Sequence, residues 1–119
     1  MTFRYDDLIG VPYKERGRGL GGMDCYGLAI ECCARMGKRL RDVWYDSCAP
    51  ELAEEHAPTL NVRKVGGDFA GALVEMRCRG ELHIGVSLGS GTFLHATKAQ
   101  GVRVSRLGVL PVISYYEVL

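Results

Sequence analysis

The most restrictive feature of the sequence is a change in the spacing of its apolar residues, from helical in the first third to strand-like in the last third. Asp24 can cap a helix that Gly37 can end, and between them the apolar residues recur on one helical face, at Cys25, Leu28, Ala29, Cys32, Cys33 and Met36. Five short runs separated by turn residues follow at 72–77, 82–88, 92–97, 101–105 and 112–118. A helix followed by about five strands predicts an α+β fold, with helices packed on one side of an antiparallel sheet.

The length and charge of the chain exclude several classes of protein. Its 119 residues fit one domain, so we expect residues 1–119 to form a single domain. Fifteen basic and fourteen acidic residues give a net charge of +1, which offers no field of one sign to attract nucleic acid. No apolar run approaches the roughly 18 residues of a membrane span. The first residues carry acids where a signal peptide would carry positive charge, so we expect synthesis in the cytoplasm without a signal peptide.

The segments between the helix and the strands carry weaker patterns. Residues 16–22 are rich in glycine and predict a loop, in which Arg16 and Arg18 are expected to be solvated or to border a cleft. Residues 38–67 are weakly patterned, apart from a short helix that could form at 50–56, and His56 there is expected at the surface.

The five cysteines are more consistent with free thiols than with a disulfide framework, because their number is odd and two are adjacent. Cys32 and Cys33 lie on the apolar stripe and are predicted to be core residues. Cys48 and Cys78 are predicted to be structural. No close Cys-x-x-Cys pair exists, so we expect no metal site, and the glycine-rich loop lacks the Gly-Lys-Ser/Thr ending of a phosphate cradle. We expect no cofactor.

Two histidines are predicted to share one face of a β-hairpin. If 89–91 forms a three-residue loop, Leu88 pairs with Thr92, and the aliphatic residues of both strands gather on one face. His83 and His95 then lie on the other face, diagonal to each other with Cα atoms about 7 to 8 Å apart. Two histidines at this distance are close enough for their side chains to interact.

Cys25 is the candidate partner of these histidines. A helix N-terminus and a nearby imidazolium both lower the pKa of a thiol, which favours the nucleophilic thiolate. In that interpretation His83 is the general base and His95 orients it, as the third member of a catalytic triad does. Cysteine is also among the most buried residue types, so the pattern alone leaves a core role for Cys25 open.

Several stretches of the sequence resemble the NlpC family of papain-like cell-wall cysteine peptidases. Gly-Val-Pro-Tyr at 10–13 and Gly-Gly-Met-Asp-Cys-Tyr-Gly-Leu at 21–28 resemble its nucleophile motif. His-Ile-Gly-Val-Ser-Leu-Gly at 83–89 and Phe-Leu-His-Ala at 93–96 resemble its base and third-residue motifs. Together with Gly-Asp at 67–68, these motifs occur in the family's order and cover about residues 9 to 107.

The resemblance implies a papain-like NlpC-type fold and a Cys-His-His triad of Cys25, His83 and His95. It implies cleavage of D-γ-glutamyl bonds in peptidoglycan stem peptides, with Tyr13 beside the nucleophile as an aid to oxyanion stabilisation. Asp24 and Tyr26 flank the nucleophile as further oxyanion or substrate-binding candidates, although Tyr26 replaces a serine that is frequent in the family.

The similarity also points to phage and prophage members, which implies a tail-tip protein as partner and a location in the virion tail. Two alternatives remain open at this stage. One is a structural or adaptor tail-tip protein that keeps the peptidase fold. The other is an amidase or acyltransferase that uses the same triad.

Overall fold

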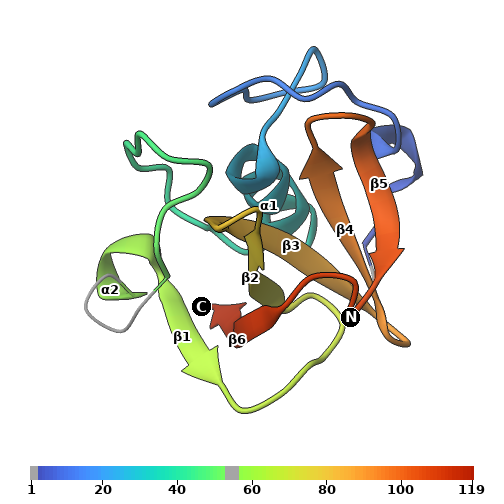
Figure 1. Ribbon diagram of the computed structural model, residues 1–119. Helices are drawn as coiled ribbons and strands as arrows, with labels where there is room; N and C mark the ends of the chain where they lie inside the picture. The colour runs from blue at the N-terminus through green and yellow to red at the C-terminus, as the bar shows by residue number, and fades with distance from the viewer. Residues whose placement is uncertain (1–2, 53–56) are drawn as a thin grey trace.

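The computed structural model describes residues 3–52 and 57–119 (Figure 1). The chain begins with a 3₁₀ helix, η1 (Asp6–Leu8), and a long loop that leads to helix α1 (Cys25–Arg35). The predicted helix at 50–56 is not formed at 50–52, its remaining residues lie outside the described ranges, and a short helix α2 (Ala57–Leu60) follows. The strands are β1 (Val62–Val65), β2 (Leu73–Cys78), β3 (Glu81–Gly89), β4 (Thr92–Thr97), β5 (Gly101–Arg106) and β6 (Val112–Val118).

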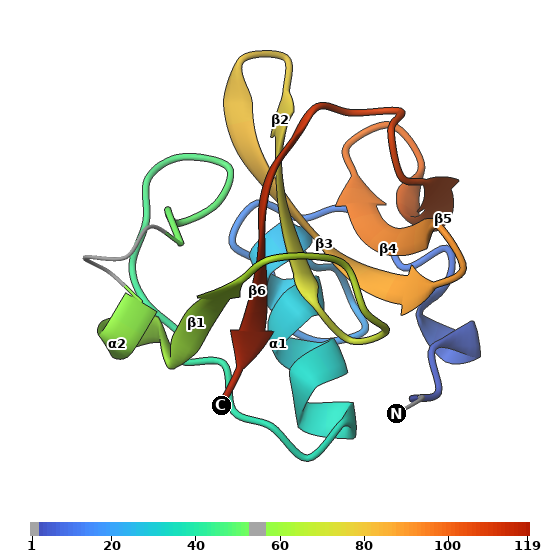
Figure 2. The same ribbon diagram turned by 90° about the horizontal axis from the view of Figure 1, so that it is seen from below.

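The strands form one six-stranded antiparallel sheet in the order β1-β6-β2-β3-β4-β5. Five of the six strands match the predicted runs, and the α+β class is confirmed. The strand absent from the prediction is β1, which pairs with β6 at the edge of the sheet (Figure 2). It has only four residues, two of them basic, and so lacks the apolar run that marks a strand in sequence.

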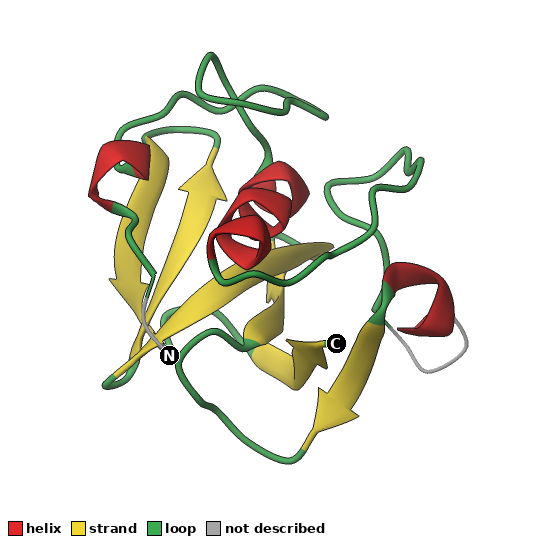
Figure 3. Cartoon of the chain, turned by 180° about the vertical axis from the view of Figure 1, so that it is seen from behind, coloured by secondary structure: helices red, strands yellow, loops and turns green. Residues whose placement is uncertain are grey.

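Helix α1 lies across the sheet and packs on β3 and β4 (Figure 3). Asp24 caps it as predicted, because its Oδ1 accepts the backbone N–H of Gly27 at 2.8 Å. The helix ends at Arg35, and Gly37 follows with φ of +76°, the left-handed conformation that favours glycine after a helix. These two local signals therefore place Cys25 at the first position of the helix.

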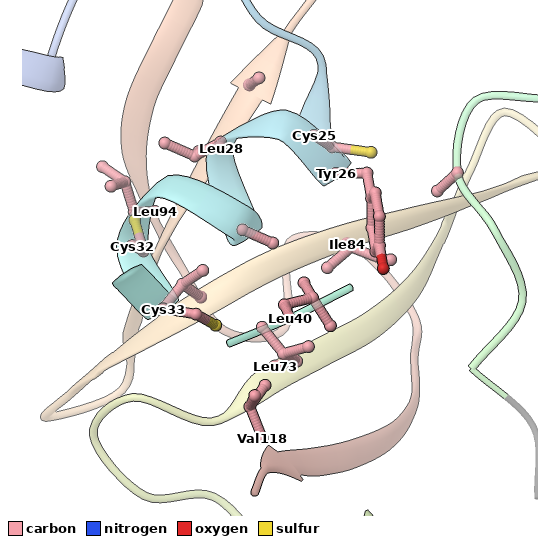
Figure 4. Close-up of a cluster of buried hydrophobic side chains, with 14 of the residues drawn as sticks. Cys25, Tyr26, Leu28, Cys32, Cys33, Leu40, Leu73, Ile84, Leu94 and Val118 are labelled. Carbon is pink, nitrogen blue, oxygen red and sulfur yellow. The ribbon is translucent and has the colours of Figure 1, made fainter. Parts of the chain in front are cut away.

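The main core lies between α1 and the sheet (Figure 4). Cys32 and Cys33 are completely buried there, which confirms the prediction that they are core residues. Because side chains alternate along a strand, β2 contributes Leu73 to this core and Val74 to a smaller cluster, which also contains Met76 and Phe93. Both faces of the central strands are therefore packed.

The β3–β4 hairpin differs from the prediction at its turn. Gly89, not Leu88, pairs with Thr92, so the connection is a two-residue turn of Ser90 and Gly91, both with positive φ. The predicted three-residue loop is wrong. A bulge between Ser87 and Gly89 absorbs the extra residue and returns the strands to the expected register, with Ser87 opposite Phe93 and Val86 opposite Leu94. The two faces of the hairpin are therefore those that the apolar pattern predicted.

Within the described residues, no helix is both long enough and apolar enough to span a membrane.

Candidate active site

A pocket of about 210 Å³ opens where the start of α1 meets β3 and β4. It brings together the three residues predicted as a triad, Cys25, His83 and His95, and it includes Tyr13. The rest of its lining comes from the loop before α2, the β2–β3 turn and the β4–β5 turn: Cys48, Cys78, Arg79, Glu81, Leu82, Ala96, Thr97, Lys98 and Ala99. Segments far apart in sequence therefore form a single cavity around one thiol and two imidazoles.

The Cys25 thiol is in its neutral form. The residue is 1% exposed, and burial raises the pKa of its thiol to about 12, although the backbone amide of Ile84, the neighbour of His83, opposes the shift. The thiol donates to the backbone carbonyl of Cys48, with an Sγ–O distance of 3.4 Å. The expectation of a lowered thiol pKa is wrong for this structure, because desolvation outweighs the helix N-terminus.

His83 and His95 form a directly bonded pair. Nε2 of His83 lies 2.8 Å from Nδ1 of His95, and the two rings meet edge to face at 77°. Burial lowers the pKa of both imidazoles to about 4, so both are neutral near pH 7. The bond to His95 occupies Nε2 of His83 and leaves Nδ1 as the nitrogen that can act as a base.

Cys25 and His83 line the same pocket, but no hydrogen bond joins these two described residues. The thiol hydrogen is directed to the Cys48 carbonyl instead. Because burial disfavours the charged form of both groups, we expect a neutral thiol beside a neutral imidazole before any proton transfer between them.

Tyr13 lies in the loop before α1, where it forms an isolated bridge with Met23, and it lines the pocket. Burial raises the pKa of its phenol, and the nearby Cys25 raises it further. The hydroxyl consequently keeps its proton and can donate a hydrogen bond into the pocket. This position is compatible with the predicted role beside the nucleophile.

The Asp24 side chain is bonded to neighbouring protein groups and does not face the pocket. Its side chain is 1% exposed and forms an ion pair with Arg18 at 3.0 Å, while the Tyr45 hydroxyl donates to its other carboxylate oxygen. Arg18 also bonds Asp42 at 2.9 Å, so the expectation that Arg18 is a solvated side chain is wrong. With both oxygens engaged, Asp24 caps the helix and anchors the loop above it, and it does not line the pocket.

Tyr26 points away from the pocket. Its side chain is completely buried, its hydroxyl donates to the backbone carbonyl of Arg41, and its ring packs edge to face on Tyr45. Tyr26 is not among the residues that line the pocket, so its position gives no support to a direct contact with substrate.

The pocket also contains residues that the sequence did not reveal. Cys48 and Cys78, predicted to be structural, both line it, and the Cys48 thiol donates to Glu81 at 2.9 Å. Arg79 and Lys98 add positive charge to the lining. No sequence pattern in residues 38–50 predicts that they form a wall of the pocket. Cys48 reaches the pocket only through the tertiary fold, and it contacts Cys25 through a backbone carbonyl, which every residue carries. His56 lies outside the described residues.

The two buried histidines predict a loss of stability in acid. Their pKa values are about 4 in the folded protein and near 6.5 when unfolded, so between these values the unfolded chain binds more protons. The contribution is complete above about pH 6.5 and is lost as the pH falls towards 4. We expect urea unfolding at pH 7 and pH 4.5 to differ by about 5 kcal/mol from the two histidines together. The double variant His83→Gln/His95→Gln should show a shallower dependence, and an unchanged dependence would contradict the assignment.

The helix-borne cysteine, the neighbouring pair of histidines and the antiparallel sheet together match the predicted NlpC-type fold. The model of the NlpC/P60 family matches residues 10–112, and the chain belongs to this family. This result confirms the family resemblance found in the motifs.

Solved structures show the same fold. The NlpC/p60 domain of the peptidoglycan hydrolase SagA superposes with a TM-score of 0.64 at 22% identity, covering 94% of this chain and 90% of that one. The P60 domain of an antigen from M. avium subspecies paratuberculosis gives 0.65 at 22% identity, covering 97% and 88%. NlpC2 from Trichomonas vaginalis gives 0.65 at 18% identity, covering 91% of this chain and 42% of that one. The comparison with curated proteins finds no match.

Proposed function

We propose that the protein is a cysteine peptidase that hydrolyses D-γ-glutamyl amide bonds in peptidoglycan stem peptides. The observation that carries this proposal is the single pocket that holds the Cys25 thiol, the bonded pair His83–His95 and the Tyr13 hydroxyl. Membership of the NlpC/P60 family supports it, as does the shared fold with a domain of the peptidoglycan hydrolase SagA.

The proposed reaction begins with a change of hydrogen-bond acceptor at Cys25. When a substrate amide occupies the pocket, the thiol turns from the Cys48 carbonyl to Nδ1 of His83, which takes its proton. Sγ attacks the amide carbon to form a tetrahedral intermediate, and His83 passes the proton to the leaving amine. The thioester that remains is hydrolysed by water, which His83 deprotonates. Positioned proton transfer of this kind contributes about 10² to 10⁴ in rate.

We expect two donors to stabilise the oxyanion. The backbone N–H of Cys25 is at the first position of α1, where backbone N–H groups have no partner within the helix. The Tyr13 hydroxyl is the second donor, since its raised pKa keeps it protonated. One such donor contributes about 2.7 to 4 kcal/mol to stabilisation of the transition state.

Digestion of a purified stem peptide, followed by mass analysis, tests the reaction type. A peptidase gives two fragments whose masses add up to the substrate plus one water. An amidase releases ammonia from a side-chain or terminal amide, and an acyltransferase joins the acyl fragment to an added amine. A structural or adaptor protein leaves the peptide unchanged, and this result would overturn the proposal.

We further propose that the protein is made in the cytoplasm and is delivered to the cell wall by a tail-tip protein of a phage or prophage. The net charge of +1 supports a carrier, because long-range attraction to an anionic wall cannot concentrate the protein there. We expect the protein to copurify with tail particles, and Cys25→Ala to assemble normally while wall hydrolysis is lost. Failure of the folded Cys25→Ala variant to assemble would favour the adaptor role.

A further inference from the structure

The hydrogen-bonded series that begins at His83 continues beyond His95. Nε2 of His95 lies 2.8 Å from Oγ of Ser105 in β5. In the β4–β5 ladder Ser105 pairs with Phe93, and Arg103 pairs with His95, so Ser105 and His95 lie on the same face of the sheet. Ser105 is half-buried, and it is not among the residues that line the pocket.

We propose that Ser105 is a positioning residue that holds both histidines in the tautomers required for proton transfer from Cys25. The proposal rests on the proposed function for its catalytic consequence, although the tautomers themselves can be measured without turnover. Ser105 acts through His95 and His83 and does not contact the reacting atoms.

The required tautomers follow from the contacts. To accept the thiol proton, His83 must have a bare Nδ1, and its hydrogen must therefore be on Nε2. That N–H donates to Nδ1 of His95, which must also be bare. His95 then carries its hydrogen on Nε2, where Oγ of Ser105 is the acceptor.

The reverse direction of the same series would block the reaction. A serine hydroxyl can donate as well as accept, and if Ser105 donated, the hydrogens would lie on Nδ1 of both histidines. His83 would then direct an N–H towards the pocket and could not take a proton from Cys25. Because Ser105 is half-buried, its own hydroxyl hydrogen can donate to water, which leaves Oγ free to accept from His95.

A hydroxyl at this position differs from a carboxylate in its effect on charge. A carboxylate beside His95 would raise the imidazole pKa, whereas a neutral hydroxyl fixes orientation without attracting a proton. Both imidazoles have lowered pKa values, and the positive charge of Arg103 contributes to the lowering at His95. After proton transfer, this charge disfavours a cation on His95, so the proton stays on His83, where the leaving amine needs it.

The tautomers can be measured by ¹⁵N NMR of the histidine rings at pH 7, in the Cys25→Ala protein so that no substrate is turned over. We expect both His83 and His95 to carry the hydrogen on Nε2. In Ser105→Ala, which removes the acceptor, we expect a population with Nδ1–H to appear at both rings. Ser105→Thr keeps the hydroxyl and should restore the original spectrum. Nδ1–H on His95 in the Cys25→Ala protein, or a spectrum that Ser105→Ala leaves unchanged, would overturn the proposal.

Kinetics with Cys25 intact supply the second measurement. Loss of one hydrogen bond predicts that Ser105→Ala lowers kcat about tenfold, with KM unchanged and activity restored in Ser105→Thr. Ser114, a half-buried serine of β6 outside the pocket, provides the matched control Ser114→Ala, which should retain wild-type kcat. An equal loss of kcat in Ser105→Ala and Ser114→Ala would show general destabilisation and would contradict a specific role for Ser105. If wild type hydrolyses no stem peptide but the Cys25→Ala protein shows the expected tautomers, the proposed function fails while the role of Ser105 in the tautomers stands.

Discussion

Replacing Cys25 with alanine is expected to reduce stem-peptide hydrolysis by on the order of 10⁶-fold, because the variant lacks the sulfur atom that is proposed to form the thioester. The loss should appear in kcat, since the variant keeps the pocket that binds substrate. Removing a completely desolvated Sγ also leaves a small cavity in the folded protein. The measurement is product formation by mass analysis, together with urea unfolding to show that the variant is folded.

Cys32 offers a matched control for this experiment. It lies on the same helix and is also completely buried, but it belongs to the core and does not line the pocket. Cys32→Ala should therefore show a comparable loss of stability and nearly wild-type turnover. If Cys25→Ala keeps its activity, Cys25 is a core residue and the nucleophile is elsewhere.

The next largest effect is expected for His83. His83→Ala removes the base and should lower kcat by about 10² to 10⁴. His95→Gln should have a smaller effect, because it changes the orientation of His83 and leaves Nδ1 in place. Imidazole added to His83→Ala should restore part of the activity by occupying the vacated space, and it should not restore activity to Cys25→Ala.

A change of leaving group can distinguish proton transfer by His83 from orientation of His83 by His95. In single-turnover experiments with a stem-peptide ester, whose leaving group needs less protonation than an amine, His83→Ala should recover more activity than it does with the amide. His95→Gln should show similar losses with both substrates. Equal activity of His83→Ala and wild type on the amide would exclude the triad.

Features governed by nearby residues could be predicted from the sequence. The start of α1 depends on the hydrogen bond that the Gly27 N–H donates to Asp24, and its end depends on the conformation of Gly37, so both ends could be placed. The two faces of the β3–β4 hairpin were also predictable, because side chains alternate along a strand. The alternation remained correct although the loop length was wrong, since the bulge beside Ser87 compensates for the shorter turn.

Features that depend on tertiary placement could not be predicted. The raised pKa of Cys25 results from burial, whereas the sequence shows only the helix N-terminus that would lower it. The acceptor at Cys48 is a backbone carbonyl, which every residue carries and no motif marks. Strand β1 lies at the sheet edge and is half charged, so only its pairing with β6 identifies it.

The contacts of Arg18 have a consequence for how a substrate can reach the thiol. The Arg18 guanidinium joins Asp24, the cap of α1, to Asp42 and Tyr45 of the segment that leads to Cys48. Swinging this segment outward would take the Tyr45 hydroxyl from the buried Asp24 carboxylate, and would take both Asp42 and Tyr45 from the Arg18 guanidinium that pairs with it. The segment therefore forms a fixed wall of the pocket and does not open to admit substrate. We expect a peptide to enter beside this fixed segment, along the β4–β5 turn that carries Lys98.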